Sequence, residues 1–295
     1  MSREIGLWGS LRNNFTTPCT AVGDRGGLPR YTWRTVFPDE ADIATEVASP
    51  EPEAQAFALQ MVARSHAGRV RPNNEDSIAF LSLAGTAVLA DGMGGLNAGE
   101  VASREAVDRV LKGLGAGLGM RQVIEDANRS IFELSQSDDD LRNMGTTLVA
   151  LQLEGSHLWL GNVGDSRIYR YRDEKLAQLT IDHSVVQQLV DNGLMTEAEA
   201  RRAPNRNIIT RALGIEAAVL VDVIEEEPKA RDLYMLCSDG VTDMIEPEAL
   251  QALFVEHAAP ASLVDAIVSA ANTAGGFDNI SVILVTVSSG AETAR

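Results

Sequence analysis

The chain has 295 residues, a formal net charge of −17 and 45% hydrophobic residues, which is typical of a folded globular protein. So acidic a chain is a poor candidate for binding nucleic acid, which requires a basic surface, and no apolar run is long enough to cross a bilayer. Its two cysteines, Cys19 and Cys237, indicate no disulfide framework. We therefore expect a cytoplasmic protein without nucleic-acid or membrane partners.

The first 56 residues differ from the rest of the chain. Basic residues come first, and the stretch from Asp39 to Glu53 then carries carboxylates without any Lys or Arg. The segment closes on the linker-like sequence ASPEPEAQ. We expect a weakly ordered extension over residues 1–56, a folded domain over residues 57–288 and a short tail over residues 289–295.

Strands and helices alternate in groups along the folded part. Strands are predicted at residues 57–66, 77–85 and 86–91, and amphipathic helices at residues 97–114 and 120–136. Strands follow at residues 145–155, 157–164, 166–172 and 175–180, and helical pieces lie within residues 182–202. The order closes with strands at 218–228 and 232–240, helices at 246–257 and 260–275, and a strand at 279–288. This order predicts an α+β fold, a four-layer α/β/β/α sandwich of two antiparallel sheets flanked by helix pairs.

Carboxylates stand at five predicted strand ends, each beside Gly or Asn. They are Asp76 (preceded by Glu75), Asp91, Asp165, Asp239 and Asp278. One acid beside one glycine indicates only a turn, but five at strand ends favour a site built on rigid anchor points. Carboxylates that come together need protons or cations for neutralisation. The four histidines are scattered and have no cysteine companions, which favours Mg²⁺ or Mn²⁺ over zinc.

The sequence LADGMGG shows how one such acid could reach a metal. Asp91 ends a buried-type strand and is followed by Gly92, Gly94 and Gly95. A glycine directly after the acid allows the backbone to come close, so that the carbonyl of Gly92 could be a further ligand. The other two glycines permit a sharp path into the next helix.

The sequences VRPNNEDS, LADGMGG, GTTL, VGDSRIY, TRALG, CSDGVTD and DNIS occur in this order. Taken together, this set resembles the metal-dependent serine/threonine protein phosphatases of type 2C (the PPM family), and most of all their bacterial members. The resemblance covers residues 57–288. It implies an enzyme that hydrolyses phosphoserine and phosphothreonine with a metal-activated water and no covalent intermediate, and we expect this enzyme to be a monomer.

The resemblance also assigns roles to individual residues. It implies two Mn²⁺ or Mg²⁺ ions held by Asp76, Asp91, Asp239 and Asp278 and by the carbonyl of Gly92, with Glu75 just outside the ligands. Asp165 matches a position that helps to hold a third ion, and Arg71 matches the arginine that grips the substrate phosphate, a role that suits a guanidinium. Phosphoprotein substrates and a cognate serine/threonine kinase are the implied partners.

Two stretches bear on catalysis and substrate choice. Many eukaryotic members have a histidine, proposed as the general acid, where this chain has Met93. Bacterial members often lack this histidine too, so the sequence does not identify the group that donates a proton to the leaving group. Residues 182–211 correspond to the flap of the family, where we expect substrate choice to be made.

The sequence has three alternative interpretations. A catalytically inactive phosphatase-like binding module should lack one of the metal aspartates, and all are present. A small-molecule phosphohydrolase would share the chemistry but not the substrate. The C-x5-R spacing from Cys19 to Arg25 lies in the extension with no strand leading into it, so a cysteine phosphatase is disfavoured, and Cys237 is predicted to pack in the core.

Overall fold

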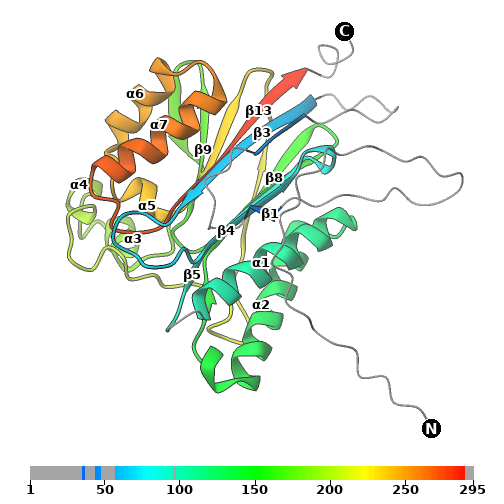
Figure 1. Cartoon of the computed structure of the whole chain (residues 1–295), viewed down its shortest axis with the longest axis vertical. Helices are drawn as coiled ribbons and strands as arrows, with labels where there is room; N and C mark the ends of the chain where they lie inside the picture. The colour runs from blue at the N-terminus through cyan, green and yellow to red at the C-terminus, as the bar shows by residue number, and fades with distance from the viewer. Residues whose placement is uncertain (1–34, 37–43, 48–56, 96–97, 290–295) are drawn as a thin grey trace, which may run out of the picture. The chain divides into compact units, whose positions relative to one another are not determined.

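The computed structural model describes residues 35–36, 44–47, 57–95 and 98–289. Within them, two antiparallel sheets stack face to face and a helix pair covers each outer face (Figure 1). The predicted four-layer α/β/β/α sandwich is confirmed.

The first sheet has the strand order β1-β4-β5-β7-β8-β11, and β6 pairs with β5. Its strands are β1 (Thr35–Val36), β4 (Asp76–Leu81), β5 (Thr86–Met93), β6 (Gly145–Thr146), β7 (Leu148–Glu154), β8 (His157–Val163) and β11 (Asp222–Glu226). The second sheet has the order β10-β9-β12-β13-β3-β2. Its strands are β2 (Ala44–Val47), β3 (Phe57–His66), β9 (Arg167–Arg172), β10 (Lys175–Gln178), β12 (Leu233–Cys237) and β13 (Ile280–Ser289).

Two long helix pairs form the outer layers. Helices α1 (Ala98–Gly115) and α2 (Met120–Ser137) pack on the first sheet, and α6 (Pro247–Glu256) and α7 (Pro260–Thr273) pack on the second. The short helices α3 (Val185–Asp191) and α4 (Glu197–Ala200) lie in the predicted flap, and α5 (Asp239–Thr242) follows β12 directly. Among the described residues, no helix is long and apolar enough to span a membrane.

Three apolar layers hold the sandwich together. Side chains alternate between the faces of each strand, so Leu89 of β5 lies between the sheets while Val88 lies under the helices. The middle layer also contains Met61, and the layer beneath α6 and α7 contains Met235 and Cys237. The predicted core role of Cys237 is confirmed, and burial raises the pKa of its thiol to about 12.

Several element boundaries differ from the prediction. Helix α1 runs on to Gly115, because Leu114 is buried in the core and keeps the last turn packed. The strand predicted at residues 145–155 is split at Thr147, because the Asp91 N–H of β5 donates to the Thr147 hydroxyl instead of to a backbone carbonyl. Strand β11 covers only Asp222–Glu226 of the predicted 218–228, and residues 239–240 begin α5 rather than extending β12.

Two short strands come from the segment predicted as an extension. Strand β1 pairs with β4, and β2 pairs with β3. The rest of residues 1–56 lies outside the described residues, and so does the C-x5-R stretch from Cys19 to Arg25 within it. Residues 290–295 of the tail also lie outside them.

Candidate metal-dependent active site

The first two predicted acids face each other on neighbouring strands. Asp76 begins β4 and Asp91 lies near the end of β5, and the two are direct partners in the antiparallel register. Side chains of such partners lie on the same face of a sheet. Asp76 is buried, with 1% of its surface exposed, so sheet pairing alone brings two carboxylates together at one sheet end.

The second sheet contributes two further acids from the opposite side of the sandwich. Asp239 begins α5 directly after β12, and Asp278 stands two residues before β13, the strand that pairs with β12. Ser238 joins the two sheets, because its hydroxyl donates a hydrogen bond of 2.9 Å to Oδ2 of Asp76.

The fifth acid lies in the turn that passes from one sheet to the other. Asp165 stands between β8 of the first sheet and β9 of the second. The buried His183 fixes this turn through two hydrogen bonds to Gly164. Its ring Nδ1 accepts a 3.0 Å hydrogen bond from the backbone N–H of Gly164, and its backbone N–H donates to the Gly164 carbonyl at 2.9 Å. The Nε2 of His183 lies 3.1 Å from Asp222. His183 is therefore a structural residue, and burial lowers the pKa of its imidazole, which favours the neutral form.

Electrostatics show that the carboxylates form one group. Burial is the main cause that raises the pKa of Asp91, and repulsion from Asp76, Asp239, Asp165 and Asp278 adds to it. Burial and the neighbouring acids likewise raise the pKa of Asp239. Burial raises the pKa of Asp76 and of Asp165 to about 7 each. A cluster of this kind needs protons or cations to be stable at neutral pH.

The group also leaves acceptor oxygens without partners. Oδ1 of Asp76 and Oδ1 of Asp239 are buried and lack a hydrogen-bond partner, although buried carboxylate oxygens in proteins nearly always have one. Among the described residues, no three His, Cys, Asp or Glu side chains are arranged to hold a metal ion directly as they stand. Binding by several carboxylates therefore requires side-chain rotation or water molecules as additional ligands, which Mg²⁺ commonly keeps. With these allowances, the donor set fits hard divalent cations.

The GTTL sequence serves to hold the backbone of Asp91. The hydroxyl of Thr146 and the N–H of Thr147 both donate to the Asp91 carbonyl, at 2.8 and 2.9 Å. The Asp91 N–H in turn donates to the Thr147 hydroxyl at 3.1 Å. The sequence identifies the motif but not this function of its threonines, since the function depends on pairing between segments over 50 residues apart.

A second missed residue, Asn279, fixes the loop that carries Glu75 and Arg71. Its Oδ1 accepts from the Glu75 N–H at 2.8 Å, and its Nδ2 donates to the carbonyls of Ala67 and Asn73 at 3.0 and 2.9 Å. Glu75 is partly buried beside the acids, and burial raises its pKa. The half-exposed guanidinium of Arg71 donates to Oδ2 of Asp278 at 2.8 Å, which places it at the rim of the cluster.

Gly92 lies where three backbone segments meet. A Cβ at this position would lie 2.1 Å from the carbonyl oxygen of Gly99 in α1 and 2.6 Å from that of Glu75. The Gly92 N–H also donates to the Glu75 carbonyl at 3.2 Å. Gly92 therefore allows a close packing of its backbone against the start of α1 and the Glu75 backbone, and the role of its carbonyl as a metal ligand stays a prediction.

Met93 is placed by apolar packing. A Cβ at Gly145 would lie 2.7 Å from Cε of Met93 and 2.8 Å from Cδ1 of Ile215, so both side chains cover the bare backbone of Gly145. A thioether in this environment has no proton to donate, and the proton donor of the reaction must come from another group.

We expect Gly92→Ala to destabilise the fold by about 1–3 kcal/mol, because the added methyl group overpacks a backbone contact that cannot relax. The measurement is the free energy of unfolding from urea denaturation. Gly95→Ala is the matched control, because a Cβ at Gly95 would meet no atom of the described residues within 4 Å. Equal stability of the two variants would contradict this packing role for Gly92.

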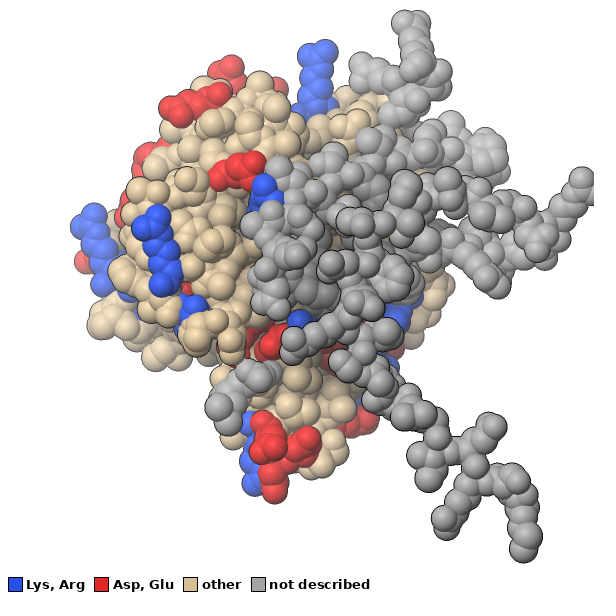
Figure 2. Space-filling view, in the orientation of Figure 1, with Lys and Arg blue, Asp and Glu red and all other residues tan. Residues whose placement is uncertain are grey.

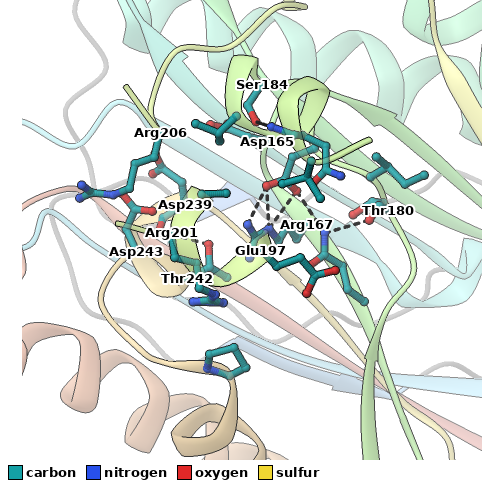
Figure 3. A pocket seen from close by; sticks show the side chains of 18 of the residues that line it. Asp165, Arg167, Thr180, Ser184, Glu197, Arg201, Arg206, Asp239, Thr242 and Asp243 are labelled. Carbon is teal, nitrogen blue, oxygen red and sulfur yellow. Dashed lines mark hydrogen bonds and ion pairs between the residues drawn. The ribbon is translucent and has the colours of Figure 1, made fainter. Parts of the chain in front are cut away.

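A cavity of about 450 Å³ adjoins the acids beneath the flap. Its lining comes from the flap, from β9 and from α5, and Figure 3 shows Asp165 and Asp239 among its side chains. Arg206 ties the returning flap to Asp243 at 3.2 Å. Asp182, at the start of the flap, accepts three hydrogen bonds from Arg167: Nε donates to Oδ1 at 2.9 Å and to Oδ2 at 3.1 Å, and Nη2 donates to Oδ2 at 2.6 Å. The flap is thus anchored at both ends next to the carboxylate group.

Carboxylates are not confined to the site. In the orientation of Figure 1, Figure 2 shows acidic side chains at the lower end of the face with a basic side chain beside them, and further acidic and basic side chains over its upper left part. The excess of acids over bases is therefore spread over the surface as well as concentrated between the sheets.

The fold and the carboxylate group define a phosphatase of the metal-dependent class. The model of the family described as "Protein phosphatase 2C" matches residues 63–272, and the chain belongs to this family, whose members use Mn²⁺ or Mg²⁺. The serine/threonine phosphatase stp of Listeria monocytogenes is 36% identical over 235 residues, which are 75% of this chain and 93% of that protein. The serine/threonine protein phosphatase PstP of Mycobacterium tuberculosis is 38% identical over 239 residues, covering 78% of this chain and 45% of PstP.

Solved structures agree with this assignment. The crystal structure of PstP from Mycobacterium tuberculosis superposes with a TM-score of 0.73 at 36% identity, covering 78% of this chain and 99% of that one. A structure of the PstP catalytic domain in complex with two manganese ions gives a TM-score of 0.70 at 35% identity, covering 79% of this chain and 99% of that one.

Proposed function

We propose that this chain hydrolyses phosphoserine and phosphothreonine in proteins, with Mn²⁺ or Mg²⁺ held by its carboxylate group. The observation that carries the proposal is the meeting of acids from both sheets, with buried unpaired oxygens on Asp76 and Asp239. When bound, two such ions would supply an activated water and neutralise charge on the phosphoryl group.

The residues of the protein would then hold the metal ions and orient the substrate phosphate. Asp76, Asp91, Asp239 and Asp278 would hold the ions together with the carbonyl of Gly92, and Asp165 a third ion. Arg71 would grip the phosphate through its guanidinium, exchanging its present partner Asp278 for the substrate. Glu75 stays beside the ligands and fixes Gly92 through its own carbonyl.

The described residues favour attack by water over attack by a cysteine. Cys237 is fully buried in the core, and its raised pKa keeps the thiol protonated. A nucleophilic cysteine needs a thiolate in an accessible, electropositive environment.

The test is phosphate release from a phosphothreonine peptide with Mn²⁺, with EDTA, and with the Asp239→Asn variant. We expect release that requires Mn²⁺ and that both EDTA and the substitution abolish. Asp108→Asn, which changes an exposed acid on α1 paired with Lys112, is the matched control and should keep full activity. Binding of the phosphopeptide by metal-loaded protein without phosphate release would instead indicate an inactive binding module.

The substrate class is tested by extending the same assay to other phosphate esters. We propose cytoplasmic phosphoproteins as substrates, among them a cognate serine/threonine kinase, with the chain acting as a monomer. The support is the family and the relatives named as serine/threonine phosphatases. Faster hydrolysis of nucleotides or sugar phosphates than of phosphoprotein would contradict the proposed substrate class and favour a small-molecule phosphohydrolase. Sedimentation analysis tests whether the chain is a monomer.

A further inference from the structure

Two large apolar side chains stand exposed beside the residues at the rim of the site. Val70 precedes Arg71 and is 61% exposed, and Phe277 precedes Asp278 and is 60% exposed. Arg71 and Asp278 form the ion pair at the rim, with Nη2 and Oδ2 2.8 Å apart. Each apolar residue is therefore one position away from a residue of the proposed phosphate and metal site.

The two loops that carry these side chains are joined along their backbones. The N–H of Arg69 donates to the carbonyl of Gly276 at 2.7 Å. Gly68 has φ of +78°, and a Cβ there would lie 2.2 Å from the carbonyl oxygen of Asp278. The close backbone approach puts Val70 and Phe277 on adjacent loops.

The loops are also held rigidly. Asn279 donates to the carbonyls of Ala67 and Asn73, which are on opposite sides of Val70. On the other loop, the Gly276 N–H donates to the carbonyl of Ala271 at the end of α7. Exposed apolar residues on a mobile loop are unremarkable, but fixed ones are ready to bind without a further ordering cost.

We propose that Val70 and Phe277 form an apolar rim that binds a hydrophobic side chain of the substrate polypeptide, within two residues of the phosphorylated serine or threonine. Residues in an extended chain are about 3.3–3.6 Å apart. When the phosphate of a bound peptide reaches Arg71, only the peptide residues next to the phosphorylated one can therefore lie over Val70 and Phe277. This inference rests on the proposed function and adds a preference for apolar sequence next to the phosphorylated residue.

The experiment compares kcat/KM for phosphothreonine peptides in which all neighbours are serine or in which one neighbour, at −2, −1, +1 or +2, is leucine. In the wild-type protein with Mn²⁺, leucine in at least one position should raise kcat/KM roughly tenfold. In the double variant Val70→Ser/Phe277→Ser, the ratio of kcat/KM for the leucine peptide to kcat/KM for the all-serine peptide should fall to near one. Phe277→Leu, which stays apolar, should retain the preference.

Val255→Ser is the matched control, because Val255 on α6 is 60% exposed and lies outside the rim; it should keep the wild-type ratio. Equal kcat/KM for all wild-type peptides, or an unchanged ratio in the double variant, would overturn the inference. A change of oligomeric state in the double variant with an unchanged peptide ratio would also overturn it and assign the surface to self-association. Absence of phosphate release from every peptide would instead contradict the proposed function.

Discussion

Substitution of Asp91 by Asn should lower Mn²⁺-dependent phosphatase activity about 10³-fold, the loss of roughly 4 kcal/mol of transition-state stabilisation. At pH 8 the same variant without metal should be more stable than the wild type. Asp91 is repelled by four neighbouring acids, and an amide removes that repulsion and can donate hydrogen bonds to them. We expect a gain on the order of 1 kcal/mol or more in the free energy of unfolding.

The measurement pairs phosphopeptide kinetics with urea denaturation in EDTA. Asp126→Asn, on the exposed face of α2 and paired with Arg129, is the control and should change neither quantity. A metal-free Asp91→Asn protein that is less stable than the wild type would contradict the view that the cluster is strained by repulsion.

Stability of the metal-free protein should fall as pH rises from 5 to about 7.5. Folding raises the pKa of Asp76 and of Asp165 to about 7, well above the unfolded value of 3.8. Between these values the folded chain binds more protons than the unfolded chain, so the free energy of unfolding decreases with pH. Above about pH 7 the contribution of Asp76 and Asp165 to this loss levels off.

Mn²⁺ should reverse this dependence. Cations compete with protons for the carboxylates, so the stabilisation by Mn²⁺ should grow over the same pH range. At a Mn²⁺ concentration of about 100 times Kd, the stabilisation of about 2.7 kcal/mol corresponds to a rise in Tm of about 5–10 °C. Thermal unfolding with Mn²⁺ and with EDTA at several pH values measures both effects. A Mn²⁺ effect that shrinks as pH rises would contradict carboxylate binding.

Much of the fold was predictable because its signals are local. The long strands β3 and β13 and the helices α1 and α2 have clear periodicity, and the order of the elements gave the four layers. The failures come from tertiary context. The pattern at residues 218–228 favours a long strand, but only Asp222–Glu226 finds a partner in β8 at the sheet edge.

The site could be predicted to the level of individual acids but not of their supports. Asp76, Asp91 and Asp239 stand out because a carboxylate at the end of an apolar run is unusual in any sequence. Ser238 and Asn279 carry no such signal: each acts through hydrogen bonds to residues more than 160 positions away. Their roles depend on the register between two sheets, which only the structure gives.

The most direct test of the carboxylate site is anomalous diffraction at the manganese edge from crystals grown with Mn²⁺. We predict two strong peaks between the sheets, in contact with Asp91 and within reach of Asp76 and Asp239, and none in crystals of Asp91→Asn. Manganese peaks elsewhere on the chain, or their absence from this group in the wild type, would contradict the central claim that these acids hold the catalytic ions.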